Sequence, residues 1–267
     1  IILGGLAADT IVTGANNDFV FGDGGQFVFE ANELLSATSL DTDQGGSDII
    51  RASGGQNYFF GGAGQDTITT GSSLDFVFGD SGQITYTDGQ LDIVATLDDA
   101  IGDADVITAG AGTNYVFGGT GADQVDTGDG DDYVFGDGGA LDFDLGSLVQ
   151  ANSTSSGIGG VDRLTVNDGT NMVFGGVGGD DIDTGDELDY VFGDGGQISL
   201  VNDQLDQMLT LDDGIGGDDV IVAGTGTNYI FGGFGGDEVD TGSGMDFAFG
   251  DGGLLDYDAG NLVLAES

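Results

Sequence analysis

Aspartate recurs in short glycine-rich stretches along the whole chain, and it is the residue type here best suited to chemistry. The 267 residues carry 48 acidic side chains against two basic ones, which gives a formal charge of -46, and they include 56 glycines but no His or Cys. Zinc and copper sites are disfavoured without His or Cys, whereas carboxylate and carbonyl oxygens suit hard divalent cations. Calcium is favoured over magnesium because it tolerates irregular coordination by about six to eight oxygens.

The charge also sets a condition for folding. Self-repulsion opposes a compact state, and Arg51 and Arg163 cannot neutralise 48 acids. The chain is therefore predicted to be disordered without cations and ordered with them, because its 39% hydrophobic residues follow a strict pattern. Nucleic acid is not expected as a partner, since phosphates would be repelled. No apolar run reaches about 18 residues, so membrane insertion is not expected either.

One heptapeptide returns at a constant interval. It reads FVFGDGG at Phe19, FVFGDSG at Phe76, YVFGDGG at Tyr133 and Tyr190, and FAFGDGG at Phe247, with a spacing of 57 residues each time. Each interval divides into five nonapeptides and a twelve-residue segment such as Asp88 to Asp99. The whole chain, 1–267, is predicted to be one continuous window of a longer array. Its units are approximately 4–60, 61–117, 118–174, 175–231 and a partial 232–267.

The best-preserved nonapeptides are GGAGQDTIT from Gly61, GGTGADQVD from Gly118, GGVGGDDID from Gly175 and GGFGGDEVD from Gly232. They resemble the GGxGxDxUx motif of RTX (hemolysin-type) calcium-binding repeat proteins. The resemblance implies an all-β parallel β-roll, or β-solenoid, with two nonapeptides per coil and two short-stranded parallel sheets. It also implies calcium between the turns of successive coils on the same edge.

The number of coils depends on the twelve-residue segments. If each is an enlarged half-turn, a unit has six half-turns and three coils, which rise about 14 Å at ordinary strand spacing. The chain would then form a rod of roughly 70 Å. The coil is expected to be right-handed.

The residue types of the motif also have a physical explanation that does not depend on the resemblance. Glycine permits positive φ and close backbone approach, so turn carbonyls can face a common centre to which aspartate adds an anionic oxygen. Two of the turns, those of Asp48 and Asp105, lack the full glycine set. The predicted metal ligands at the sixth motif position are Asp9, Asp18, Asp48, Asp66, Asp75, Asp105, Asp123, Asp132, Asp162, Asp180, Asp189, Asp219, Asp237 and Asp246.

Two groups of residues depart from the motif. Asparagine replaces the aspartate in one half-turn per unit, and it either offers a carbonyl oxygen to calcium or caps the turn by backbone hydrogen bonds. These residues are Asn57, Asn114, Asn171 and Asn228. In the GDGG half-turn the sixth residue is apolar, and an aspartate at the second position is either a substitute ligand or a turn former. These residues are Asp23, Asp80, Asp137, Asp194 and Asp251.

Alternation along each short strand separates a core from an outer face. The predicted inward residues are Ile11, Val20, Ile50, Phe59, Ile68, Val77, Ile107, Val116, Val125, Val134, Leu164, Val173, Ile182, Val191, Ile221, Ile230, Val239 and Ala248. The flanking outward positions carry an aromatic stripe on one sheet. Its members are Tyr58, Phe60, Phe76, Phe78, Tyr115, Phe117, Tyr133, Phe135, Tyr190, Phe192, Tyr229, Phe231, Phe247 and Phe249.

An exposed apolar stripe of this size is typical of an interface. The stripe is therefore either buried by the twelve-residue segments, which would fold back as a second layer, or a predicted contact surface for lateral packing of copies of this chain. Cover by the segments is supported by their own apolar residues, such as Leu91 and Val94. A third possibility is that the strand faces are assigned wrongly.

No catalytic constellation stands out, so no enzymatic activity is predicted. The leading hypothesis is a secreted, calcium-stabilised structural protein, such as an extracellular filament, surface layer or adhesin stalk of a bacterium. The alternative is the calcium-binding portion of an exported enzyme or toxin. Resemblance to RTX proteins implies type I secretion and an extracellular or cell-surface location. Ice binding would need a flat array of outward threonines, which Thr67 and Thr69 fit but Gln124 and Asp126 interrupt one unit later.

Overall fold

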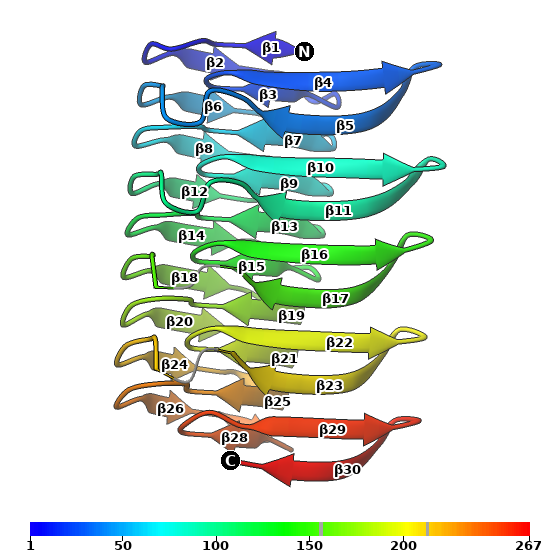
Figure 1. Ribbon diagram of the computed structural model, residues 1–267, viewed down its shortest axis with the longest axis vertical. Coiled ribbons are helices and arrows are strands. Elements are labelled where there is room, and N and C mark those ends of the chain that lie inside the picture. Colours follow the sequence, from blue (N-terminus) through cyan, green and yellow to red (C-terminus); the bar gives the residue numbers. More distant parts are fainter. Residues whose placement is uncertain (155–156, 212–213) are drawn as a thin grey trace.

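The chain folds as a stack of short strands in three layers. The computed structural model describes residues 1–154, 157–211 and 214–267, and every element it assigns there is a β-strand. Figure 1 shows the stack with its two termini at opposite ends and a series of hairpins along one side. The all-β prediction is confirmed. None of the described residues forms a helix long and apolar enough to cross a membrane.

Two parallel sheets form the coil itself. Sheet A consists of β1 (Ile2–Leu3), β3 (Phe19–Phe21), β7 (Asn57–Phe60), β9 (Asp75–Phe78), β13 (Asn114–Phe117), β15 (Tyr133–Phe135), β19 (Gly169–Phe174), β21 (Glu187–Phe192), β25 (Thr225–Phe231), β27 (Ser243–Gly244) and β28 (Phe247–Phe249). Sheet B consists of β2 (Thr10–Val12), β6 (Ile49–Arg51), β8 (Thr67–Thr69), β12 (Val106–Thr108), β14 (Gln124–Thr127), β18 (Arg163–Val166), β20 (Asp181–Thr184), β24 (Val220–Val222) and β26 (Glu238–Asp240).

The core between sheets A and B is the predicted inward series. Neighbouring strands pair in register, so that Val77 lies beside Val116 in sheet A and Ile68 beside Ile107 in sheet B. The residues from Ile11 to Ile230 in the series are all buried in this one cluster. Val239 packs against it, and Ala248 is exposed because it belongs to the last coil of the stack. Stacked β-branched side chains suit such a narrow parallel core.

The register corrects the predicted number of coils. Tyr58 pairs with Phe19, 39 residues before it, and with Phe76, 18 residues after it, so one 57-residue unit adds two strands to sheet A rather than three. The missing pair of half-turns leaves the coil altogether. The stack is accordingly shorter than predicted, about 40 Å at ordinary strand spacing.

The residues that leave the coil form a third, antiparallel layer. Sheet C consists of the hairpins β4 (Gly25–Glu30) with β5 (Glu33–Ser39), β10 (Gly82–Thr87) with β11 (Gln90–Thr96), β16 (Gly139–Asp144) with β17 (Ser147–Ser153), β22 (Gly196–Val201) with β23 (Gln204–Thr210), and β29 (Leu254–Asp258) with β30 (Asn261–Glu266). Each twelve-residue segment is thus the end of a hairpin, and the GDGG half-turn is its beginning (Figure 1).

The hairpin turns have a local cause. Asp88 and Gly89 both have positive φ, 52° and 75°, and they separate the paired residues Thr87 and Gln90. Two consecutive residues of this kind make the type I′ turn, whose twist matches that of antiparallel strands. The same pair of positive angles recurs at Leu145–Gly146, Asn202–Asp203, Ala31–Asn32 and Ala259–Gly260.

The last glycine of GDGG lets the chain reverse from sheet A into sheet C. A Cβ on Gly82 would lie 2.2 Å from the ring of Phe78, and one on Gly139 would lie 2.2 Å from the ring of Phe135. The backbone therefore passes directly over the aromatic ring that ends the preceding strand. Glycine is required here because any side chain would displace that ring.

Sheet C covers the aromatic stripe. Phe60, Phe117, Phe135, Phe192 and Phe231 are 0% exposed, and they share a cluster with hairpin residues including Ile84, Val94, Leu141 and Ile198. The rings stack along the axis at centroid distances such as 4.8 Å between Phe78 and Phe117. The stripe is half-buried only at Tyr133, Tyr229, Phe247 and Phe249.

This burial corrects the prediction that the aromatic stripe is a contact surface for other copies. The residues in question are Tyr58, Phe60, Phe76, Phe78, Tyr115, Phe117, Tyr133, Phe135, Tyr190, Phe192, Tyr229, Phe231, Phe247 and Phe249. The alternative, cover by the chain's own twelve-residue segments, is the arrangement found. The physical reason is that burying a large apolar face costs less entropy when the covering segment is already tethered beside it.

Three-layer packing also explains the 57-residue period. A hairpin supplies two adjacent strands to sheet C, and the two coils beneath it supply two adjacent strands to sheet A. Because strands in any sheet are about 4.8 Å apart, one hairpin and two coils have the same width. Successive hairpins then pair with each other, as β11 does with β16, without a gap.

Candidate metal centres

The turns of the coil lie along two edges, and the predicted ligands divide between them. The aspartate edge holds the turns that lead into sheet B, with Asp9, Asp48, Asp66, Asp105, Asp123, Asp162, Asp180, Asp219 and Asp237. The asparagine edge holds the turns that lead into sheet A, with Asp18, Asn57, Asp75, Asn114, Asp132, Asn171, Asp189, Asn228 and Asp246. In-register stacking of the coils brings each of these residues beside its counterpart in the next coil.

Carboxylates on the aspartate edge form a ladder. The backbone N–H of Asp66 donates to Oδ1 of Asp105 at 2.7 Å, and the N–H of Asp105 donates to Oδ1 of Asp123 at 2.7 Å. The same bond joins every consecutive pair from Asp9 to Asp237, at 2.6 to 3.0 Å. One oxygen of each carboxylate from Asp48 onward is therefore satisfied by the neighbouring coil.

The second oxygen of these carboxylates has no hydrogen-bond donor. Oδ2 is buried and unpartnered in Asp48, Asp66, Asp105, Asp123, Asp162, Asp180, Asp219 and Asp237. Most of these residues are only 1 to 2% exposed. A buried carboxylate oxygen without a partner is costly, and a row of them calls for a bound cation.

Glycine carbonyls lie beside the unpartnered oxygens. The position that a Cβ on Gly61 would take is 2.1 Å from the carbonyl oxygen of Gly79 and 2.3 Å from Oδ2 of Asp66. At Gly136 the corresponding distances are 2.4 Å to the carbonyl oxygen of Gly175 and 2.3 Å to Oδ2 of Asp162. A carboxylate and a carbonyl from adjacent coils thus converge on one space that only glycine leaves open.

Burial and mutual repulsion perturb these acids. Burial, reinforced by the charge of Asp48, raises the pKa of Asp66 to about 8. Burial raises the pKa of Asp123 to about 7. The pKa of Asp105 is also raised, first by burial and then by the charge of Asp80. A divalent cation would relieve both effects, because it replaces lost hydration and neutralises adjacent charges.

The oxygens on the aspartate edge suit calcium better than a metal that must be held by a cluster of three or more side chains. Among the described residues no three acidic side chains converge closely enough to hold an ion by themselves. A cation would take a carboxylate from each of two coils and complete its shell with glycine carbonyls. Calcium accepts such mixed, irregular oxygen shells. The residues of the aspartate edge therefore fit calcium.

The GDGG aspartates connect the hairpin to the coil. Oδ1 of Asp80 accepts the N–H of Asp103 at 3.4 Å, where the chain returns from the hairpin, and Oδ2 accepts the N–H of Thr120 in the next coil at 2.7 Å. Asp23, Asp137 and Asp194 make equivalent pairs of bonds. Asp251 is exposed in the last unit. Both oxygens have donors, so the geometry is that of a turn former, and metal ligation by these residues stays a prediction.

The asparagines on the other edge use their amides as donors. Nδ2 of Asn57 donates to Oδ1 of Asp75 at 2.8 Å and to the carbonyl oxygen of Gly55 at 2.8 Å. Of the two roles proposed for these residues, the structure has the hydrogen-bonded turn. Coordination of an ion by Asn57, Asn114, Asn171 or Asn228 would require their amide oxygens, and ligation by them also stays a prediction.

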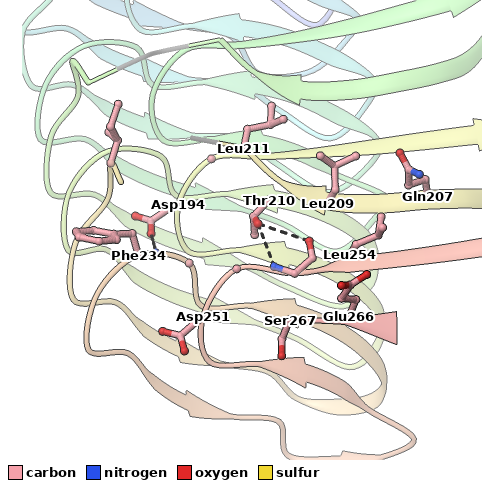
Figure 2. A pocket seen from close by; sticks show the side chains of 15 residues that line it. Asp194, Gln207, Leu209, Thr210, Leu211, Phe234, Asp251, Leu254, Glu266 and Ser267 are labelled. Carbon is pink, nitrogen blue, oxygen red and sulfur yellow. Dashed lines mark hydrogen bonds between the residues drawn. The ribbon is translucent and has the colours of Figure 1, made fainter. Parts of the chain in front are cut away.

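A separate pocket of about 690 Å³ lies at the C-terminal end of the stack. Figure 2 shows Asp194 and Phe234 on one wall and Thr210, Leu254 and Glu266 near the hairpin roots. The hydroxyl of Thr210 accepts the N–H of Gly253 at 3.0 Å, so it is engaged in holding β23 and β29 together. The residues that line this pocket include no basic side chain, and none of them belongs to the row of aspartates on the aspartate edge.

Comparison with known families agrees with the geometry. The model of the RTX calcium-binding nonapeptide repeat (4 copies) matches residues 1–26, 43–77, 102–125, 108–140 and 213–253, more than half of the chain. This chain belongs to the RTX calcium-binding nonapeptide repeat family. No curated protein matches it. RTX nonapeptides are calcium-binding motifs, and the proteins that carry them are typically secreted by type I systems.

Sequence reasoning offered a covering layer formed by the twelve-residue segments as one possibility, but it did not identify the hairpins that build this layer. The stretch TYTDGQLDIV, from Thr85 to Val94, has Asp-Gly between two alternating segments, which is a strong hairpin signal. The signal was obscured because only this copy has Asp-Gly, whereas others have Ala-Asn or Asn-Asp at the same turn.

Proposed function

We propose that this chain is the calcium-stabilised stem of a secreted structural protein, such as a filament, surface layer or adhesin stalk. The observation that carries the proposal is the row of buried aspartate Oδ2 atoms without donors on the aspartate edge. They recur on every coil from Asp48 to Asp237, so the whole length of the stack, rather than one local site, depends on cations. A cation that binds only the folded chain stabilises it by mass action.

The three-layer architecture supports a mechanical role. Each coil contacts its neighbours by backbone ladders in two parallel sheets, and the hairpins add a third set of bonds between units. A solenoid of this kind extends in one dimension by repetition, because each unit contacts only its neighbours. A stem secreted unfolded would become rigid on meeting extracellular calcium.

A calcium titration of the 267-residue chain tests the proposal. Circular dichroism should report a disordered chain in chelator at neutral pH and β-structure once calcium is added, with reversal on renewed chelation. Magnesium at the same concentration is the control, and it should be much less effective because it keeps its waters. Equal order in chelator and in calcium would overturn the metal-driven account. Electron microscopy of the same samples would reveal whether copies assemble into filaments or sheets.

A further inference from the structure

The two edges of the coil differ in the charge that faces each gap between coils. On the aspartate edge every gap lies between two carboxylates, such as those of Asp105 and Asp123. On the asparagine edge every gap lies between one carboxylate and one amide, such as those of Asp132 and Asn114. A divalent cation gains most where two anionic oxygens must be neutralised together. The charge pattern alone therefore separates the edges.

Amide groups on the asparagine edge bond to the types of atom that a calcium ion would collect. Nδ2 of Asn114 donates to Oδ1 of Asp132 in the next coil at 2.9 Å. It also lies 2.9 Å from the carbonyl oxygen of Gly110 and 3.0 Å from that of Gly112, both in its own turn. Asn171 repeats the arrangement with Asp189 at 2.9 Å and a turn carbonyl at 2.9 Å.

Neighbouring groups fix the orientation of these amides. Oδ1 of Asn114 and of Asn228 is buried without a donor, and the amide of Asn114 is oriented by the carbonyl oxygens that accept its NH₂ group. Oδ1 of Asn171 accepts the N–H of Asp132 at 3.1 Å, and Oδ1 of Asn57 accepts the N–H of Asp18 at 3.3 Å. The flipped amide would place its NH₂ against a backbone donor and its oxygen against a carboxylate. The NH₂ group is therefore the part that points at Asp75, Asp132 and Asp189.

A threonine at the start of the turn lies beside the aspartate in three of these turns, at Thr70, Thr127 and Thr184. The hydroxyl of Thr184 donates to Oδ2 of Asp189 at 2.9 Å. Burial raises the pKa of Asp132, and the Thr127 hydroxyl beside it counteracts part of that rise. Oδ2 nevertheless has no donor in full hydrogen-bond geometry in Asp18, Asp75 and Asp132. Asp75, Asp132 and Asp189 do each accept a hydrogen bond from an asparagine side chain, a partner that the aspartate edge lacks.

Gly71 and Gly110 on the asparagine edge stand at the second motif position and frame a different space from that of the aspartate edge. A Cβ on Gly110 would meet the backbone of Gly71 and Ser72, and one on Gly71 would meet the backbone of Ser53 and Gly54. On the aspartate edge the first motif position is glycine, and a Cβ there would meet a carboxylate oxygen and a carbonyl oxygen, as at Gly61. On the asparagine edge the first position carries a side chain, as at Thr70 and Ala109, so the space framed at Gly61 has no counterpart in those turns.

We infer that calcium loads only the aspartate edge, and that the asparagine edge is closed by asparagine–aspartate hydrogen bonds that need no cation. The inference rests on the proposed function, because it presupposes that the aspartate edge binds calcium. It assigns the two edges different tasks. Amides hold the register of the coils on one side, while calcium controls whether the other side can close.

Two matched substitutions test the inference by counting bound calcium in equilibrium dialysis. Asp123 and Asp132 both occupy the sixth motif position and are 2% and 0% exposed, but they lie on opposite edges. Asp123→Asn should reduce the calcium bound per chain by one or two ions, because the carboxylate faces two gaps. Asp132→Asn should leave the number unchanged. Loss of calcium in Asp132→Asn to the same extent would overturn the inference, whereas a wild-type chain that binds no calcium would instead refute the proposed function.

A converse substitution and a direct image complete the test. Asn114→Asp should create a pair of facing carboxylates, so it should need more calcium than the wild type to reach half-maximal folding, and saturating calcium should restore the wild-type melting temperature. Should any variant fail to fold, anomalous scattering from wild-type crystals grown with calcium decides the question. Peaks along the aspartate edge alone support the inference, and peaks along both edges overturn it.

Discussion

Replacing Gly136 by alanine should disturb the aspartate edge in a measurable and local way. The new Cβ would lie 2.3 Å from Oδ2 of Asp162 and 2.4 Å from the carbonyl oxygen of Gly175, whereas ordinary contacts begin at 3.4 Å. Two coils must therefore separate by about 1 Å, and overpacking of this kind typically costs about 1–3 kcal/mol. The Cβ would also occupy the space where the two oxygens converge, so calcium affinity should fall together with stability.

The chain contains a matched control for this substitution. Gly250 occupies the same place in the last GDGG turn, but no heavy atom lies within 4 Å of the position its Cβ would take. Gly250→Ala should be neutral or slightly stabilising, by up to about 1 kcal/mol, because it only restricts the unfolded chain. The two substitutions share their effect on chain entropy and differ in the presence of a following coil.

Thermal unfolding followed by circular dichroism in saturating calcium is the assay. A cost of about 2 kcal/mol lowers the melting temperature of a domain of this size by roughly 4–8 °C. Gly136→Ala should show this decrease and need more calcium to reach half-maximal folding, while Gly250→Ala should match the wild type. Equal melting temperatures and calcium midpoints for the two variants would refute the account of the glycine-framed space.

Three further predictions concern the core, the pH dependence and the metal. Phe117→Ala should lower the free energy of unfolding in urea by about 3–5 kcal/mol, because Phe117 is fully buried between sheets A and C. Phe234→Ala is the control and should cost far less, because the Phe234 ring is 53% exposed. Similar values for the two variants would contradict the conclusion that sheet C covers the aromatic stripe. In chelator, the free energy of unfolding should be greatest below the ordinary aspartate pKa of 3.8 and should decrease as pH rises through about 7 to 8. The reason is that the pKa values of Asp123 and Asp66 are raised in the folded state, so protonated carboxyls favour folding. A melting temperature that rises with pH in chelator would contradict this sign. In saturating calcium the trend should reverse, since protons compete with the cation for the same carboxylates, and melting curves at pH 5 and pH 8 in the same calcium concentration would reveal whether they do.

Much of the coil could be predicted from local pattern. The middle residue of each short strand identified the inward series from Ile11 to Ile230, because successive side chains in a strand point to opposite faces. The recurring aspartate located the turns of the coil in the same way, but it did not separate the two edges, and metal ligation in these turns stays a prediction. Strand alternation also placed the aromatic residues on the outer face of one sheet.

Local pattern could not decide how many coils a unit contains. A half-turn and the first strand of a hairpin look alike when each is a glycine-rich bend followed by a few apolar residues, as in GDSGQITYT from Gly79. The difference is made by Gly82, whose backbone crosses the ring of Phe78 and turns the chain outward. That crossing depends on a ring and a bend that meet only after sheet A has formed.

The sequence by itself determined that this chain is a repetitive β-structure, because its spacing places aspartate oxygens at regular intervals and aliphatic side chains in a narrow core. Only the tertiary structure decided that the aromatic stripe is covered by hairpins and that the two edges differ. The cover over the stripe and the difference between the edges both depend on which half-turns stack upon each other. The stacking in turn depends on the equal widths of one hairpin and two coils. A residue such as Asn114 acquires its donor role only from the coil beside it, which lies 18 residues away in the chain.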